Sequence, residues 1–114
     1  MIEATLIGYL RNELGVHVSA SVPRDRPQRF VTVERTGGAL DQFRDLPMFA
    51  VQAWGVSAAD AASLADDVRK ALPGLIEIEE VARVTVGSTY NFPDPDSGQA
   101  RYQTVCDLVV KVDW

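Results

Sequence analysis

The sequence has a single cysteine, Cys106, and a single histidine, His17. One cysteine cannot form a disulfide within the chain, and no CxxC pair or Cys/His cluster is present that could hold zinc. No apolar run approaches the roughly 20 residues that cross a bilayer, and Glu3 stands where a secretory signal would carry positive charge. We therefore expect a protein of a cytoplasm-like compartment, without a membrane segment, a metal or a cofactor.

Positive charge is also scarce, with a formal net charge of −5 and a pI of about 4.7. Proteins that grip the phosphates of nucleic acid are usually basic, so this class is not expected. The charge is uneven, because residues 20–44 hold five arginines against three acids while the rest of the chain is acidic. Blocks of opposite sign suit self-association or docking on a neighbour, although incidental clustering on a solvated surface would give the same pattern.

The remaining composition is that of one globular domain spanning residues 1–114. A chain of 114 residues lies within the common size range of single domains, and 46% of its residues are hydrophobic. Helical periodicity predicts one helix over residues 2–14, followed by Gly15 as a stop, and a second over residues 57–72. Ser57 is expected to cap the second helix, with Asp60 in a variant of the capping box, and Pro73 and Gly74 to end it.

Alternating apolar residues predict strands over residues 16–22, 30–35, 48–54, 81–90 and 101–112. The strand over residues 48–54 has few charges and is expected inside the sheet, and Val84, Val86 and Tyr90 are expected on one face of theirs. The long connections 37–47 and 91–99 are expected as loops available for binding. The order α-β-β-β-α-β-β predicts an α+β fold, with two helices packed on a mostly antiparallel sheet.

No residue pattern supports catalysis, so an enzyme is not expected. His17 lies between two valines without a partner for acid–base work. Cys106 falls on the apolar face of its strand and is interpreted as a core residue. Asp94, Asp96 and Gly98 resemble part of a calcium loop, but the third alternating ligand and the later glutamate of that pattern are missing, so a turn is favoured over a metal site.

The chain resembles the tail terminator (tail-completion) proteins of long-tailed, non-contractile bacteriophages, especially those of actinobacterial hosts. The resemblance spans nearly the whole chain and lies in residues 23–27, 30–38, 49–55, 57–72 and 90–102. It implies a structural virion protein at the head-proximal end of the tail, assembled in the host cytoplasm. There a ring of six subunits would cap the tail tube, end its polymerisation and join head-completion proteins, while DNA passes through without sequence-specific binding.

Within this resemblance, residues 24–29, residues 36–45 and the loop 91–99 are the expected contacts with neighbouring subunits or with the major tail tube protein, and Phe92 is the expected anchor of that loop. The expected interface residues are Arg24, Arg26, Arg29, Arg35, Asp41, Gln42, Phe43, Arg44, Phe92, Asp94 and Asp96.

Two other readings stay open. A stopper or adaptor component of the head–tail connector would have a similar size and no catalysis. A small ligand-sensing domain, usually a dimer, would use a glycine-containing loop such as residues 36–38 to close over a metabolite.

Overall fold

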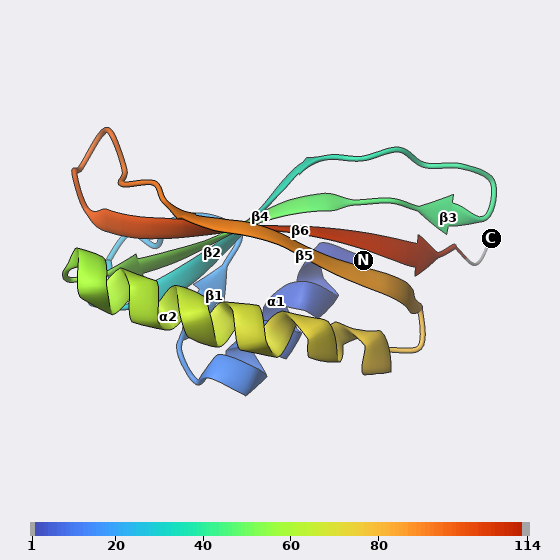
Figure 1. Ribbon diagram of the computed structural model, residues 1–114, viewed down its shortest axis with the longest axis horizontal. Helices are drawn as coiled ribbons and strands as arrows, with labels where there is room; N and C mark the ends of the chain where they lie inside the picture. Colours follow the sequence, from blue (N-terminus) through green and yellow to red (C-terminus); the bar gives the residue numbers. More distant parts are fainter. Residues whose placement is uncertain (1, 113–114) are drawn as a thin grey trace.

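A six-stranded sheet carries two α-helices on one of its faces, as the computed structural model shows (Figure 1). The structure describes residues 2–112, and none of the helices in that part is both long and apolar enough to span a membrane. The elements are α1 (Ile2–Leu14), β1 (His17–Ser19), β2 (Phe30–Gly37), β3 (Arg44–Asp45), β4 (Met48–Gly55), α2 (Ala58–Ala71), the 3₁₀ helix η1 (Leu72–Glu77), β5 (Val81–Asn91) and β6 (Ala100–Lys111). The predicted α+β class and element order are confirmed, with β3 as an additional short strand.

The strands follow the order β1-β2-β4-β6-β5, and β3 pairs with the end of β6 on the side that β4 occupies. β4 lies between β2 and β6, as its low charge predicts. Every pair is antiparallel except β1 and β2, which run parallel. A hairpin cannot join parallel neighbours, so residues 20–29 carry the chain back along the sheet before β2 begins.

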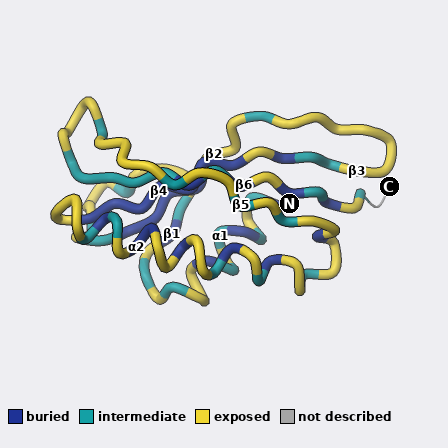
Figure 2. The backbone as a smooth tube through the Cα atoms, in the orientation of Figure 1, coloured by how far each residue is buried: buried dark blue, intermediate teal, exposed yellow. Residues whose placement is uncertain are grey.

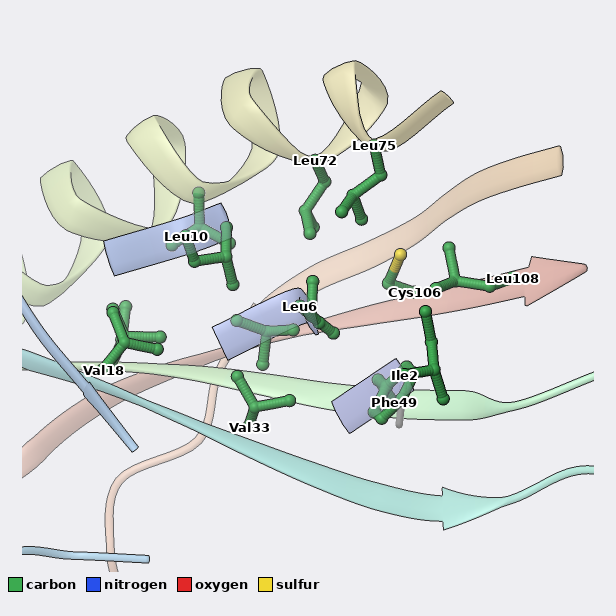
Figure 3. Packing of buried hydrophobic residues seen from close by; sticks show 14 of the residues in the cluster. Ile2, Leu6, Leu10, Val18, Val33, Phe49, Leu72, Leu75, Cys106 and Leu108 are labelled. Atoms are coloured by element: carbon green, nitrogen blue, oxygen red, sulfur yellow. The ribbon is translucent and has the colours of Figure 1, made fainter. Parts of the chain in front are cut away.

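The core lies between the helices and one face of the sheet (Figure 3). Leu6 and Leu10 of α1 are fully buried, and Figure 3 shows them pointing toward Leu72 and Leu75 and toward the strands. From the sheet, Phe49 is equally buried. Each such side chain contributes roughly 1.5–3 kcal/mol of hydrophobic free energy when it leaves water. The apolar stripe predicted for the second helix is confirmed, because all of its members are buried: Ala61, Leu64, Ala65, Val68 and Leu72.

The helix ends follow local chemistry. Gly15 adopts a φ of 66°, and its N–H donates to the Arg11 carbonyl at 3.0 Å, which closes α1. Ser57 Oγ accepts from the Asp60 N–H at 3.1 Å, so the predicted cap is present. The prediction that Pro73 and Gly74 end the second helix is confirmed, because α2 stops at Ala71 with Leu72 as its C-cap. The chain then continues as the 3₁₀ helix η1. Proline fits there because the first turn of a helix needs no N–H from it.

A bulge in β5 changes which side chains share a face. Val86 pairs with Cys106 and Thr89 with Thr104, so β5 has one residue more than β6 over this stretch. The Thr89 and Thr104 hydroxyls lie 2.9 Å apart on the helix side of the sheet. Tyr90 is therefore turned to the helix-free face, where its hydroxyl accepts from Gln103. The prediction that Tyr90 shares a face with Val84 and Val86 is wrong, because an extra residue reverses the alternation.

Cys106 is a core residue, as predicted: it is fully buried, and burial raises the pKa of its thiol to about 12. Because the thiolate is the reactive form, we expect iodoacetamide at pH 8 to alkylate the folded protein on the order of 1,000-fold more slowly than an ordinary exposed cysteine. Mass spectrometry over time measures this rate, and the unfolded chain in denaturant is the control. Labelling of the native protein at the unfolded rate would contradict the assignment.

Candidate assembly surfaces at the two ends of the sheet

The expected interface residues gather at opposite ends of a molecule 42 Å long (Figure 1). We call residues 38–47 the arm, residues 91–99 the tip and residues 20–29 the arginine loop. The arm end holds Arg35, Asp41, Gln42, Phe43 and Arg44, and the tip end holds Arg24, Arg26, Arg29, Phe92, Asp94 and Asp96. Most of the charged residues in these two sets form ion pairs or hydrogen bonds with residues at the same end of the molecule.

The arm is a braced hairpin. Asp41 Oδ1 accepts from the backbone N–H groups of Phe43, at 2.9 Å, and of Arg44, at 2.7 Å. Asp41 Oδ2 lies 2.8 Å from Arg44 Nη2. The bond from Phe43 and then those from the Arg44 side chain lower the pKa of Asp41 below its usual range. At the base of the arm, the Leu46 N–H donates to the Ala39 carbonyl at 2.9 Å. Asp41 and Arg44 thus hold the turn in shape.

Two further contacts tie the arm to the body. The Val112 N–H donates to the Phe43 carbonyl at 3.0 Å, next to the pairing of β3 with β6. The Arg35 guanidinium lies 2.7 Å from Asp45 Oδ1 and 3.1 Å from Glu3 Oε1, which joins β2, the arm and α1. Arg35 therefore holds the arm in place through contacts within its own chain. The predicted long connection over residues 37–47 contains the short strand β3, and these bonds give the segment a defined structure.

The braced arm presents apolar side chains to solvent. Leu40 is 61% exposed and Phe43 is 70% exposed, and Figure 2 shows exposure along most of the arm. Gln42 between them is exposed as well. Aromatic and large aliphatic side chains held out on a rigid support are typical anchors of protein–protein interfaces, because little conformational freedom remains to be lost on binding.

At the tip end, the arginine loop and the tip lie together although about 70 residues separate them. Arg26 Nη1 donates to Gln99 Oε1 at 2.9 Å and to Ser97 Oγ at 3.3 Å. Arg29 Nε lies 2.8 Å from Asp60 Oδ1, which attaches the same loop to the start of α2. Arg24 is exposed. The arginine-rich block of the sequence is therefore no single positive patch, because its members lie at both ends and most of them contact neighbouring side chains.

The tip itself is closed by a turn. Asp94 Oδ2 accepts from the Ser97 hydroxyl at 2.6 Å and from the Ser97 N–H at 3.2 Å. The Gly98 N–H donates to the Asp94 carbonyl at 2.8 Å, and Gly98 has a φ of 71°. The hydroxyl bond lowers the pKa of Asp94. The turn is confirmed. Within residues 2–112, no group of three His, Cys, Asp or Glu side chains could hold a metal ion, and Asp96 is exposed.

Aromatic rings and guanidinium groups stack beneath the tip on the helix-free face. The rings of Phe30 and Trp54 lie 5.1 Å apart and 13° from parallel. The guanidinium groups of Arg26 and Arg101 lie 5.5 and 5.0 Å from the Trp54 ring, and Arg101 is also 4.7 Å from the Phe92 ring. Phe92, 43% exposed, thus serves partly as an internal contact. Sequence reasoning missed Trp54 and Arg101, since a strand's alternation shows which face a residue occupies and not which distant loop covers it.

The stack predicts that Arg26 shields the Trp54 ring from solvent. Replacing Arg26 by alanine removes one guanidinium from Trp54 and both polar bonds to the tip, so Trp54, now only 2% exposed, should become accessible. In a Trp114→Phe background Trp54 is the remaining tryptophan, and acrylamide quenching of its fluorescence should rise about twofold or more over the parent. Arg24→Ala is the matched control and should leave quenching unchanged; equal quenching in all three proteins would contradict the assignment.

A hollow of about 390 Å³, which we call the tip hollow, opens beside this stack. Its lining includes Ser21, Val22, Arg26, Glu34, Asp96 and Arg101. Buried polar groups lie at its floor and bond to one another. Trp54 Nε1 donates to Thr32 Oγ1 at 2.9 Å, and Thr32 Oγ1 donates to Gln52 Oε1 at 2.6 Å. Gln52 Nε2 donates to Gln103 Oε1 at 2.9 Å and to Glu34 Oε2 at 3.3 Å.

The sequence matches no described protein family and no curated protein. Among solved structures, the chain is similar to a chain of the virion of a native gene transfer agent particle. The superposition has a TM-score of 0.64 at 15% identity and covers 90% of this chain and 84% of the other. Similarity over so much of both chains shows that the two share a fold.

Proposed function

We propose that this protein is a structural component of a phage-like virion, and specifically the tail terminator that caps the tail tube as a ring. Three independent lines support the proposal. Residues 23–27, 30–38, 49–55, 57–72 and 90–102 resemble tail terminator proteins. A chain of a gene transfer agent virion has the same fold, and the surfaces suited to contact lie at two opposite ends of the molecule.

The observation that carries the proposal is the braced arm with its exposed Leu40 and Phe43. A monomeric protein gains nothing from a rigid hairpin that holds two large apolar side chains in water, whereas an assembling subunit uses such a hairpin as an anchor. The role needs no catalytic group. An overall charge of −5 also suits a ring through which DNA passes, because a negative wall does not retain phosphates. The proposed partners are further copies of this chain, the major tail tube protein and a head-completion protein.

Electron microscopy of particles from a phage with a nonsense codon in this gene tests the proposal. We expect overlong tails without heads beside filled heads without tails, because tube growth would lack its stop and the head its joining surface. A plasmid copy of the gene should restore normal virions. Tails of normal length without heads would instead indicate a stopper or adaptor of the connector, and normal virions would refute both roles.

The native mass of the purified protein separates the proposal from a ligand-sensing dimer. A mass of six subunits supports the ring. A stable dimer that binds a metabolite and is absent from purified virions would favour the sensor and contradict a structural role. Mass spectrometry of purified virions shows whether the chain is part of the particle. That result does not depend on whether the ring closes before it meets the tube.

A further inference from the structure

The arm end offers a projecting aromatic group at a fixed position. Phe43 is 70% exposed, its own N–H is bonded to Asp41 at 2.9 Å, and its carbonyl accepts from Val112 at 3.0 Å. Both backbone groups are therefore held within the chain, and the side chain is left outside. This arrangement fixes the backbone from which the ring projects without burying the ring, so the ring is available to a partner with a matching hollow.

The tip hollow at the opposite end is lined by charged groups of both signs, among them two guanidinium groups. Two arginines and three acids line it, so neither sign of charge dominates: Arg26, Arg101, Glu34, Asp94 and Asp96. Its buried floor offers no free donor, because the N–H and O–H groups of Trp54, Thr32 and Gln52 all donate to protein acceptors. A polar ligand would thus find no free donor on the floor. Guanidinium faces, by contrast, stack well on aromatic rings.

We infer that Phe43 of one copy inserts into the tip hollow of the next copy and stacks on Arg26. The hollow of about 390 Å³ falls in the size range of pockets that accept small organic groups, so one aromatic side chain fits. Val22, 36% exposed at the rim, and Leu40 beside Phe43 would bury apolar surface around it. This inference rests on the proposed ring, and it names the contact that closes it.

The placement of the two surfaces decides what kind of assembly results. The arm and the tip hollow lie at opposite ends of a 42 Å molecule, so one chain cannot satisfy both from within (Figure 1). Two different patches that contact each other make a heterologous interface, which repeats from copy to copy and closes as a ring when the rotation permits. A two-fold dimer would instead need one patch that matches itself.

Cysteine crosslinking with a short bis-maleimide tests the contact. A chain with Gln42→Cys and Ser21→Cys keeps Phe43 and should yield a ladder of covalent oligomers, with positions 42 and 21 joined between copies in the mass spectrum of the digest. A mixture of the two single variants should stop at covalent dimers, since each chain has one reactive end. Cys106 is buried and does not interfere. The matched control combines Gln42→Cys with Ser63→Cys, an exposed position on α2, and should give at least tenfold less linkage.

Linkage confined to two copies of position 42, or equal linkage in the control, would overturn the inference. Absence of the 42–21 link both in the purified protein and in purified virions would also overturn it. These outcomes are distinguishable from failure of the proposed function. A 42–21 link in a phage whose virions stay normal without the gene would keep the contact and refute the tail role, whereas overlong tails without the link would do the reverse.

Discussion

Replacing Phe49 by alanine is expected to lower the free energy of unfolding by about 3–5 kcal/mol. Phe49 is fully buried in β4, between its register partners Arg35 on β2 and Cys106 on β6, and its side chain points into the core below α1 (Figure 3). Removing the ring loses its hydrophobic transfer energy and leaves a cavity that the flanking strands cannot close. Urea denaturation followed by circular dichroism measures the change as a lower midpoint with an unaltered slope.

Val56→Ala is the matched control for that substitution. Val56 follows β4 directly but is 68% exposed, so its truncation should change stability by no more than about 0.5 kcal/mol. A loss below about 1 kcal/mol for Phe49→Ala would contradict the assignment of Phe49 to a close-packed core.

The elements with strong internal patterns were predictable from the sequence. α2 has a capping serine, an apolar stripe and charges sorted along its length, and each of these acts within a few residues. β4 has few charges because sheet neighbours flank it on both sides. In such segments the local preference and the final packing agree, so a pattern of spacing is enough to identify them.

Features that depend on distant partners were not predictable. The bulge before Thr89 reverses which side chains of β5 face the helices, yet nothing in the alternation of the strand marks the extra residue. The parallel pairing of β1 with β2 depends on where residues 20–29 cross the molecule. The η1 helix after α2 was not predictable either, because a proline such as Pro73 can end one helix and also begin the next.

The candidate site likewise contains residues that the sequence could identify and contacts that it could not. Exposed turn residues such as Phe43 and Asp41 could be named from a loop longer than its strands require. That Asp41 braces the turn, while the Phe43 side chain is left exposed, follows from the three-dimensional structure alone. The contact of Arg26 with Ser97 and Gln99 has no sequence pattern at all, because polar groups about 70 residues apart meet only when the sheet is complete.

Gly38→Ala is expected to displace the arm and abolish its function while the core stays folded. Gly38 has a φ of 111°, and a Cβ there would lie 2.0 Å from the Leu46 carbonyl oxygen and 2.9 Å from the Pro47 Cα. The unfavourable φ alone costs about 1–2 kcal/mol, and the clash with rigid backbone adds to it. The two strands of the arm should separate at its base, so the bond from the Leu46 N–H to the Ala39 carbonyl would break.

Hydrogen exchange measures this local change: the amides of Asp41 and Leu46 should lose protection, while the fully buried strand residues Val31 and Val51 keep theirs. Gly8→Ala is the matched control, because it adds a methyl group to α1 with no atom within 4 Å, and better helix propensity should stabilise the protein by about 0.5–1 kcal/mol. With the arm displaced, Phe43 no longer stands where a neighbour's hollow can receive it, so Gly38→Ala should fail to restore normal tails in the nonsense phage and Gly8→Ala should succeed. Equal rescue by both would show that the arm's shape is irrelevant to assembly.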